Sequence, residues 1–139
     1  MEAHSLIFEQ RYPAKASVLH EVRKHLRDLL FQQQLASFQV DQLILVTNEA
    51  CTNIIQHGYD DNSPGEFVLE IFMTNTEIAF RITDFAKPID DTFTTPRTLD
   101  DSRPGGLGIH FMHQLMDHIE FSRKPDNSGN ILFMKKHLS

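Results

Sequence analysis

The segment Leu43–Tyr59, LILVTNEACTNIIQHGY, constrains the fold more than any other part of the chain. Its apolar residues recur at helical spacing and fill one broad arc, so the segment is predicted to form a long helix packed against a core. On that helix Glu49 and Asn53 lie one turn apart at the edge of the apolar arc, with His57 beside them. A carboxylate and an amide at this border need partners, because desolvating them unpaired is costly. A cation with a phosphate would satisfy both groups, and so would the backbone of a neighbouring strand.

The composition limits the classes of protein to which the chain can belong. With 139 residues, of which 40% are hydrophobic, residues 1–139 are predicted to form one domain with its own core. The net charge of −6 leaves no basic stripe for a nucleic acid, although a compact anion such as a nucleotide can still bind at helix N-termini. The single cysteine, Cys51, falls in the apolar arc, and the lack of a disulfide framework favours a cytoplasmic protein. No signal peptide or membrane-spanning stretch is expected.

The order of the predicted elements indicates the architecture. Helices are expected at 16–35, with Ser17 as the N-cap, at 43–59, and after Gly105, with a break at 38–41. Strands are expected at 5–11, 66–73, 78–83, 119–123 and 131–136. Two helices, a hairpin, a long loop, a helix and a final hairpin predict an α/β (α+β) two-layer sandwich, with one mostly antiparallel sheet and helices on one face. The loop at 85–104 has few apolar residues, and loops of about this length are usually lids, binding loops or disordered segments.

Two further motifs carry chemistry beside the Glu49 and Asn53 pair. Asp84 follows a buried strand, where it would either accept hydrogen bonds from a ligand such as an adenine amino group or begin a turn. Gly105-Gly106-Leu107-Gly108 opens a helix, and glycines there allow a phosphate to approach the free N–H groups, although they are also ordinary loop residues. Lys124 is interpreted as a solvated charge. The histidines His110, His113 and His118 lack the cysteines or carboxylates that would complete a zinc site.

Together, in this order and spacing, these residues resemble the GHKL, or Bergerat-fold, ATP-binding superfamily, and within it the anti-sigma-factor serine/threonine kinases. The N box of that family corresponds to Glu49-Ala50-Cys51-Thr52-Asn53, running on to His57-Gly58-Tyr59. The aspartate box corresponds to Asp84-Phe85-Ala86 and the glycine box to Gly106-Leu107-Gly108. The terminal GNILFMKKHL also resembles the final strand of the family. The resemblance covers nearly the whole chain and implies ATP and Mg²⁺ as cofactors.

The resemblance also implies a role for each site residue. Glu49 would be the general base toward a serine or threonine hydroxyl, and Asn53 would be the ligand of Mg²⁺. Asp84 would bind adenine, and Arg103 would either reach the phosphates or remain a solvated loop charge. The full nucleotide-binding set is Asn53, His57, Asp84, Ala86, Arg103, Gly105, Gly106, Leu107 and Gly108. Two departures from the family pattern are Ala86, where a glycine is usual, and Asn130-Ile131, where a threonine is frequent near the adenine.

Three functions remain open at this point. The leading one is a kinase that phosphorylates a STAS-type anti-anti-sigma partner with Mg-ATP and sequesters a sigma factor. The second is a nucleotide-binding module that switches partners without phosphoryl transfer. The third is an ATPase or a histidine-kinase-like domain, which is disfavoured because no dimerisation helix with a phosphoacceptor histidine precedes the site. The family resemblance also suggests a homodimer, and the apolar residues of the helix at 18–30 are expected to form either its surface or the core.

Overall fold

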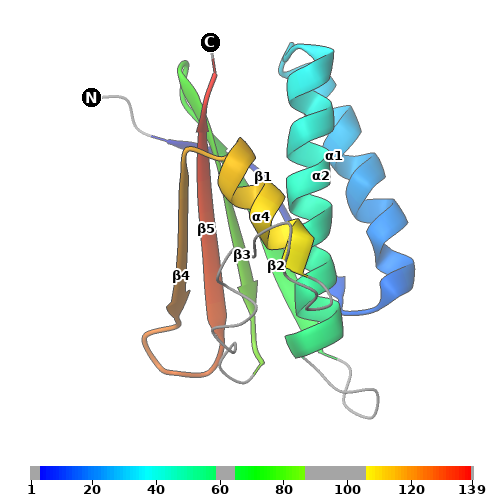
Figure 1. Ribbon diagram of the computed structural model, residues 1–139, viewed down its shortest axis with the longest axis vertical. Helices are drawn as coiled ribbons and strands as arrows, with labels where there is room; N and C mark the ends of the chain where they lie inside the picture. Colours follow the sequence, from blue (N-terminus) through cyan, green and yellow to red (C-terminus); the bar gives the residue numbers. More distant parts are fainter. Residues whose placement is uncertain (1–3, 59–64, 87–105, 139) are drawn as a thin grey trace.

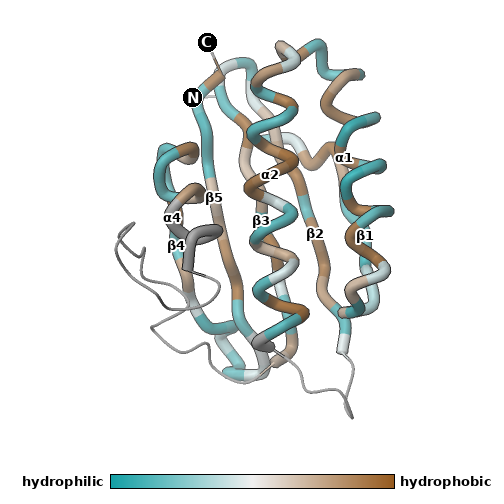
Figure 2. The backbone as a smooth tube through the Cα atoms, turned by 45° about the vertical axis from the view of Figure 1, so that its right-hand side comes forward, coloured by the Kyte–Doolittle hydropathy of each residue, from teal (hydrophilic) through white to brown (hydrophobic). Residues whose placement is uncertain are grey.

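Five antiparallel strands form one sheet in the order β1-β2-β3-β5-β4 (Figure 1). The strands are β1 (Ser5–Pro13), β2 (Glu66–Met73), β3 (Glu77–Asp84), β4 (His118–Arg123) and β5 (Asn130–His137). This computed structural model describes residues 4–58, 65–86 and 106–138, with only the backbone described at 57–58 and 106–110. The helices lie against one face of this sheet (Figure 2). The predicted two-layer α/β architecture is therefore confirmed.

Within residues 4–58, 65–86 and 106–138, the helical layer consists of α1 (Leu19–Gln32), α2 (Ser37–Asn53) and α4 (Gly106–Leu115). Helix α2 lies between the other two and packs on both of them (Figure 2). A 3-10 turn, η1 (Ala16–Val18), precedes α1, and a π-helical turn, η2 (Ile54–Gly58), follows α2. Within the described residues, no helix has both the length and the apolar character needed to span a membrane.

The core lies between the sheet and the helices. The predicted strand at 66–73 is β2, in which Phe67, Leu69 and Ile71 alternate as the buried positions, and the register places Leu69 opposite Ile82 and Ile71 opposite Phe80. The inward-facing positions of α1 are Val22, Leu26 and Leu30, each at most 1% exposed. These three residues therefore belong to the core, whereas Leu19 and Leu29 of the same helix are only partly buried.

Buried residues of α2 include the chain's single cysteine. Cys51 is fully buried, and burial raises the pKa of its thiol to about 12. The thiol is therefore protonated at neutral pH, which is the state of a small core residue rather than of a nucleophile.

Three predicted helix boundaries differ from the structure. The segment 38–41, predicted as a break, is the first turn of α2, and the break lies at 33–36, where Gln34 has a φ of 62°. The prediction failed because Phe38 is 63% exposed, so the first apolar residue of α2 lies off the buried stripe. Ser17 is not an N-cap: it lies within η1, and the N-cap of α1 is Val18, which makes no side-chain capping bond.

The third difference is the end of the long helix, which was expected to continue regularly to Tyr59. Helix α2 ends at Asn53, and the chain then widens into the π-helical turn η2. A π turn holds more residues than an α turn, so the angular positions predicted beyond Asn53, including that of His57, do not apply. Single π turns are frequent at functional sites, and this one begins directly after Asn53.

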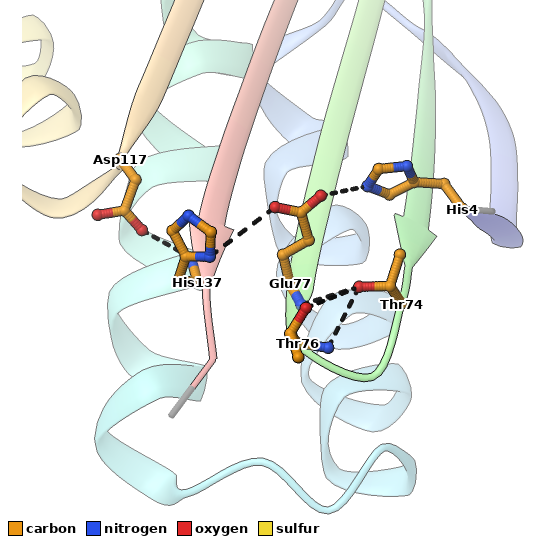
Figure 3. A network of polar contacts seen from close by, with 6 residues as sticks. All are labelled: His4, Thr74, Thr76, Glu77, Asp117 and His137. Atoms are coloured by element: carbon orange, nitrogen blue, oxygen red, sulfur yellow. Dashed lines mark hydrogen bonds and ion pairs between the residues drawn. The ribbon is translucent and has the colours of Figure 1, made fainter. Parts of the chain in front are cut away.

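The end of the sheet opposite Asp84 is closed by polar contacts around Glu77 (Figure 3). The Glu77 carboxylate lies 2.7 Å from His4 Nε2 and 3.9 Å from His137 Nδ1, so it joins the first and last strands to β3. The backbone N–H of His137 donates to Asp117 Oδ2 at 2.6 Å. Both ends of the described chain therefore lie where β3 begins, at the end of the sheet opposite Asp84.

One buried polar atom predicts a stabilising substitution. Thr47 in α2 is 0% exposed, and its hydroxyl is the one buried side-chain polar atom in the described residues without a hydrogen-bond partner. Thr47→Val, which removes this hydroxyl at nearly constant shape, is expected to raise the free energy of unfolding by about 1 kcal/mol. Urea unfolding would measure the change. Thr52→Val is the control, since the Thr52 hydroxyl donates to the Asn48 carbonyl at 2.7 Å and its removal should not stabilise the protein. An unchanged or lower stability of Thr47→Val would contradict the prediction.

Candidate nucleotide-binding site

Two of the predicted site residues, Asn53 and Asp84, lie at one end of the molecule. Helix α2 and strand β3 both end there, and strand β5 begins there (Figure 1). Asn53, at the end of α2, and Asp84, at the end of β3, are therefore brought to the same end because the helix and the strand run in the same direction. Gly106, Leu107 and Gly108 form the first turn of α4, and their helix packs against α2. The first turn of a helix has N–H groups without intrahelical partners, which favour an anion.

Glu49 and Asn53 are both half-buried on α2. Within the described part of the chain, neither side chain has a hydrogen bond or an ion-pair partner. The backbone of a neighbouring strand, which was one of the two partners expected from the sequence, does not fill this role. A carboxylate and an amide left open at the edge of a buried face are therefore available to a ligand, and their oxygens are of the kind that Mg²⁺ prefers.

The helix that carries these residues is held by its neighbours on the outer side. Arg23 of α1 donates from Nη1 to Asn48 Oδ1 at 2.9 Å, which ties α1 to the residue preceding Glu49. The Thr52 hydroxyl bonds back to the Asn48 carbonyl at 2.7 Å. Polar side chains next to Glu49 and Asn53 are thus engaged within the protein, while Glu49 and Asn53 have no such contact among the residues that the structure describes.

Asp84 is 2% exposed and is held by three donors. Its Oδ1 accepts the Ala86 backbone N–H at 2.9 Å, the Asn130 backbone N–H at 3.3 Å and the Asn130 side-chain Nδ2 at 2.9 Å. The bond from Ala86 is that of a turn, and the bonds from Asn130 come from strand β5, so Asp84 begins a turn and also lies in a built polar site. Among the described residues, Oδ2 has no hydrogen-bond donor. One carboxylate oxygen is fixed by three donors, and the other has none within the described part of the chain.

The turn between β4 and β5 packs closely against the backbone of Asp84 and Phe85 at Gly129. An added Cβ at Gly129 would lie 1.9 Å from the Asp84 carbonyl oxygen and 2.9 Å from the Phe85 Cα. Only a glycine permits the two backbones to approach this closely.

The Phe85 ring is 39% exposed and is contacted by two cations, with Lys124 Nζ at 4.7 Å and Arg11 Cζ at 5.5 Å from its centroid. Lys124 was interpreted as a solvated charge, and that interpretation is wrong.

Sequence reasoning missed two residues of this site. Asn130 was noted only as a departure from the family pattern, yet its amide holds Asp84, whereas Ile131 pairs with Thr83. Arg123 was not considered, although Nη1 of its guanidinium donates at 3.0 Å to both the Ala86 carbonyl and Asn130 Oδ1. The periodicity of a helix or a strand cannot predict the contact of Asn130 with Asp84 or that of Arg123 with Ala86, because each joins residues far apart in the chain.

Several predicted residues lie outside what the structure describes. Arg103 and Gly105 are outside the described residues, as is most of the predicted lid loop, at 87–105. The backbone of His57 lies in η2. Ala86 is 6% exposed, and its N–H completes the turn at Asp84, so the alanine fits the position where a glycine is usual in the family. Within the described residues, no three His, Cys, Asp or Glu side chains are grouped to hold a metal ion by themselves.

Comparison with known proteins identifies the family. The sequence profile of the histidine kinase-like ATPase domain matches residues 12–136. The chain belongs to the histidine kinase-like ATPase family. The serine-protein kinase RsbW of Bacillus pumilus is 28% identical to it over 96% of this chain and 86% of the relative. The anti-sigma F factor of Bacillus subtilis is 30% identical over 73% of this chain and 71% of the relative. The serine/threonine-protein kinase BtrW of Bordetella bronchiseptica is 31% identical over 68% of each chain.

A solved structure agrees with the fold of this histidine kinase-like ATPase. The structure of the RsbU and RsbW domains of a Mycobacterium tuberculosis protein superposes with a TM-score of 0.69 over 94% of this chain, at 14% sequence identity. This chain spans 31% of that longer chain. The relatives confirm the predicted GHKL anti-sigma-factor family and its class of enzyme, the protein serine/threonine kinases.

Proposed function

We propose that this histidine kinase-like ATPase, acting as one domain over residues 1–139, binds Mg-ATP and phosphorylates a serine or threonine of a STAS-type anti-anti-sigma protein. The observation that carries the proposal is a pair of polar groups, Glu49 and Asn53, one turn apart at the end of α2 where Asp84 also lies, neither of which has a partner in the described ranges 4–58, 65–86 and 106–138. A domain that only packed against a partner would have no need of an open carboxylate and amide at the edge of its core.

The proposed roles follow from the chemistry of each group. Glu49 would accept the proton of the attacking serine or threonine hydroxyl. The hydroxyl oxygen would then bond to the γ-phosphorus as the bond from that phosphorus to the leaving ADP breaks. Asn53 would offer its amide oxygen to Mg²⁺, a hard ligand for a hard cation, and the ion would offset charge on the phosphates. Asp84 would accept the adenine amino group on Oδ2, since Oδ1 already has three donors.

The remaining nucleotide contacts are proposed from the family pattern. The first turn of α4, at Gly106, Leu107 and Gly108, would bind phosphate through backbone N–H groups. His57, Ala86, Arg103 and Gly105 are proposed to border the nucleotide, with the loop at 85–104 closing over it. These assignments stay predictions.

The proposed partners are supported by what the relatives are called. Relatives named serine-protein kinase and anti-sigma F factor favour a protein that phosphorylates an anti-anti-sigma protein and also binds a sigma factor. The net charge of −6 agrees with protein partners rather than nucleic acid. We further propose a homodimer in the cytoplasm, where both ATP and sigma factors are found.

Isothermal titration calorimetry with ATP, in the presence and absence of Mg²⁺, tests the site. Asn53→Ala is expected to abolish the Mg²⁺-dependent part of ATP affinity, and Asp84→Asn is expected to weaken ATP binding by about 10- to 100-fold, because it weakens a charge-assisted hydrogen bond. Asn48→Ala, on the same helix but bonded to Arg23, is the control and should bind ATP normally. Equal ATP binding by all of these variants would rule out the proposed site.

A transfer assay tests the activity itself. Radiolabelled ATP and Mg²⁺ are incubated with the protein and with each purified STAS-domain protein of the same organism. Label on one of those proteins, dependent on Glu49, would support the kinase. Tight ATP binding with no transfer to any of them would instead support the alternative, a nucleotide-dependent partner switch without phosphoryl transfer.

A further inference from the structure

The Arg123 side chain, at the end of β4, is engaged on every nitrogen. Nε donates to Asn127 Oδ1 at 3.0 Å and Nη2 donates to the Asn127 carbonyl, so the guanidinium is fixed to the turn between β4 and β5. Nη1 points the other way, and donates at 3.0 Å to the Ala86 carbonyl and at 3.0 Å to Asn130 Oδ1. Asn127 has a φ of 63°, a conformation that asparagine tolerates better than most residues, and this shapes the turn around the guanidinium.

A chain of hydrogen bonds continues from Arg123 to the site. The Asn130 amide accepts from Arg123 on Oδ1 and donates from Nδ2 to Asp84 Oδ1 at 2.9 Å. The positive guanidinium, the amide and the carboxylate therefore form a relay in which each group orients the next. A reversed Asn130 amide would place its oxygen against the carboxylate and its N–H₂ against the guanidinium, and both contacts would be repulsive.

We propose that Arg123 and Asn130 are positioning residues for base recognition, and that they act through Asp84. The inference rests on the proposed function, because it assigns to Asp84 the adenine amino group. With Oδ1 fixed by the relay and by the Ala86 N–H, the carboxylate plane is fixed, and Oδ2 is held in one direction. Without Arg123 the Asn130 Oδ1 loses its charged donor, so the Asn130 side chain orients Asp84 Oδ1 less firmly and Oδ2 is held less closely to that direction.

A merely structural role for Arg123 makes a different prediction. If Arg123 only held the turn between β4 and β5, its loss would weaken the binding of any purine nucleotide to the same extent. If Arg123 acts through Asp84, its removal lowers the affinity only for nucleotides that carry an amino group at position 6 of the purine. ATP and purine riboside triphosphate, which lacks only that amino group, separate the two roles.

The test is calorimetry of both nucleotides with Mg²⁺, using wild type, Arg123→Met and Asn127→Gly. Wild type is expected to prefer ATP by about tenfold or more, the value of one charge-assisted hydrogen bond. Arg123→Met is expected to lose most of that preference by weakening ATP alone. Asn127→Gly keeps the positive φ and removes one tether of Arg123, so a smaller loss in the same direction is expected, and this variant decides the matter if Arg123→Met does not fold.

Lys124→Met is the matched control, since Lys124 directly follows Arg123, lies over the Phe85 ring, and has no side-chain hydrogen bond or ion pair with Asp84 or Asn130 among the described residues. Its preference for ATP should equal that of wild type. If wild type prefers ATP and Arg123→Met and Asn127→Gly keep that preference, or lose affinity equally for both nucleotides, the positioning role is overturned while the proposed function stands. If wild type binds neither nucleotide, the proposed function falls and the positioning role falls with it.

Discussion

Replacing Glu49 with glutamine is expected to slow phosphoryl transfer by about 100- to 10,000-fold, the usual contribution of a general base. Glutamine keeps the size of the side chain and its place on α2, and removes the group that accepts a proton. Because Glu49 is half-buried and has no partner among the described residues, its loss should not disturb a structural contact. The binding of Mg-ATP should therefore stay within about threefold of wild type, since proton acceptance matters only in the transition state.

Single-turnover transfer to the STAS-domain substrate, with the protein in excess, measures this change. Calorimetry on the same preparation measures ATP affinity, and Glu21→Gln, in the first turn of α1, is the control for loss of a carboxylate. Transfer by Glu49→Gln at more than a tenth of the wild-type rate would remove Glu49 from the role of base. A joint loss of ATP binding and transfer would instead assign Glu49 to the binding of the nucleotide.

The second large effect is expected from Gly129→Ala. The new Cβ would lie 1.9 Å from the Asp84 carbonyl oxygen and 2.9 Å from the Asp84 carbonyl carbon, which are backbone atoms at the end of a central strand. Asp84 pairs with Phe67 of β2, and Gly129 directly precedes β5, so a shift of either backbone would disturb the sheet, and the free energy of unfolding should fall by about 3 kcal/mol. Any folded protein that remains should have Asp84 displaced and ATP affinity lowered by about tenfold or more.

Urea unfolding and calorimetry check the two parts of this prediction. Ser128→Ala is the neighbouring control, since Ser128 is exposed and bonds only within the turn, to Asp126 Oδ1 at 2.6 Å. That variant should lose less than about 1 kcal/mol, as expected of an exposed hydrogen bond. Gly129→Ala with wild-type stability and ATP affinity would mean that the close approach of the turn to Asp84 has no role in either.

Local patterns in the sequence were sufficient for most of the fold. The alternation of Phe67, Leu69 and Ile71 and the helical spacing of Val22, Leu26 and Leu30 each arise within one element. Their faces could be assigned because burial repeats with the period of the element itself. Where an apolar residue leaves the buried face, as Phe38 does, the same reasoning placed the start of α2 too late.

Some features of the candidate site could likewise be predicted from local sequence patterns, and others depend on the tertiary structure. Glu49 and Asn53 are neighbours by helix geometry alone, and Asp84 follows a strand, so the sequence by itself determined which polar groups stand at the ends of α2 and β3. The tertiary structure decided what surrounds them. Asn130 and Asp84 are 46 positions apart and Arg123 and Ala86 are 37 apart. Such contacts depend on the sheet order, which places β5 beside both β3 and β4, and no local period encodes that order.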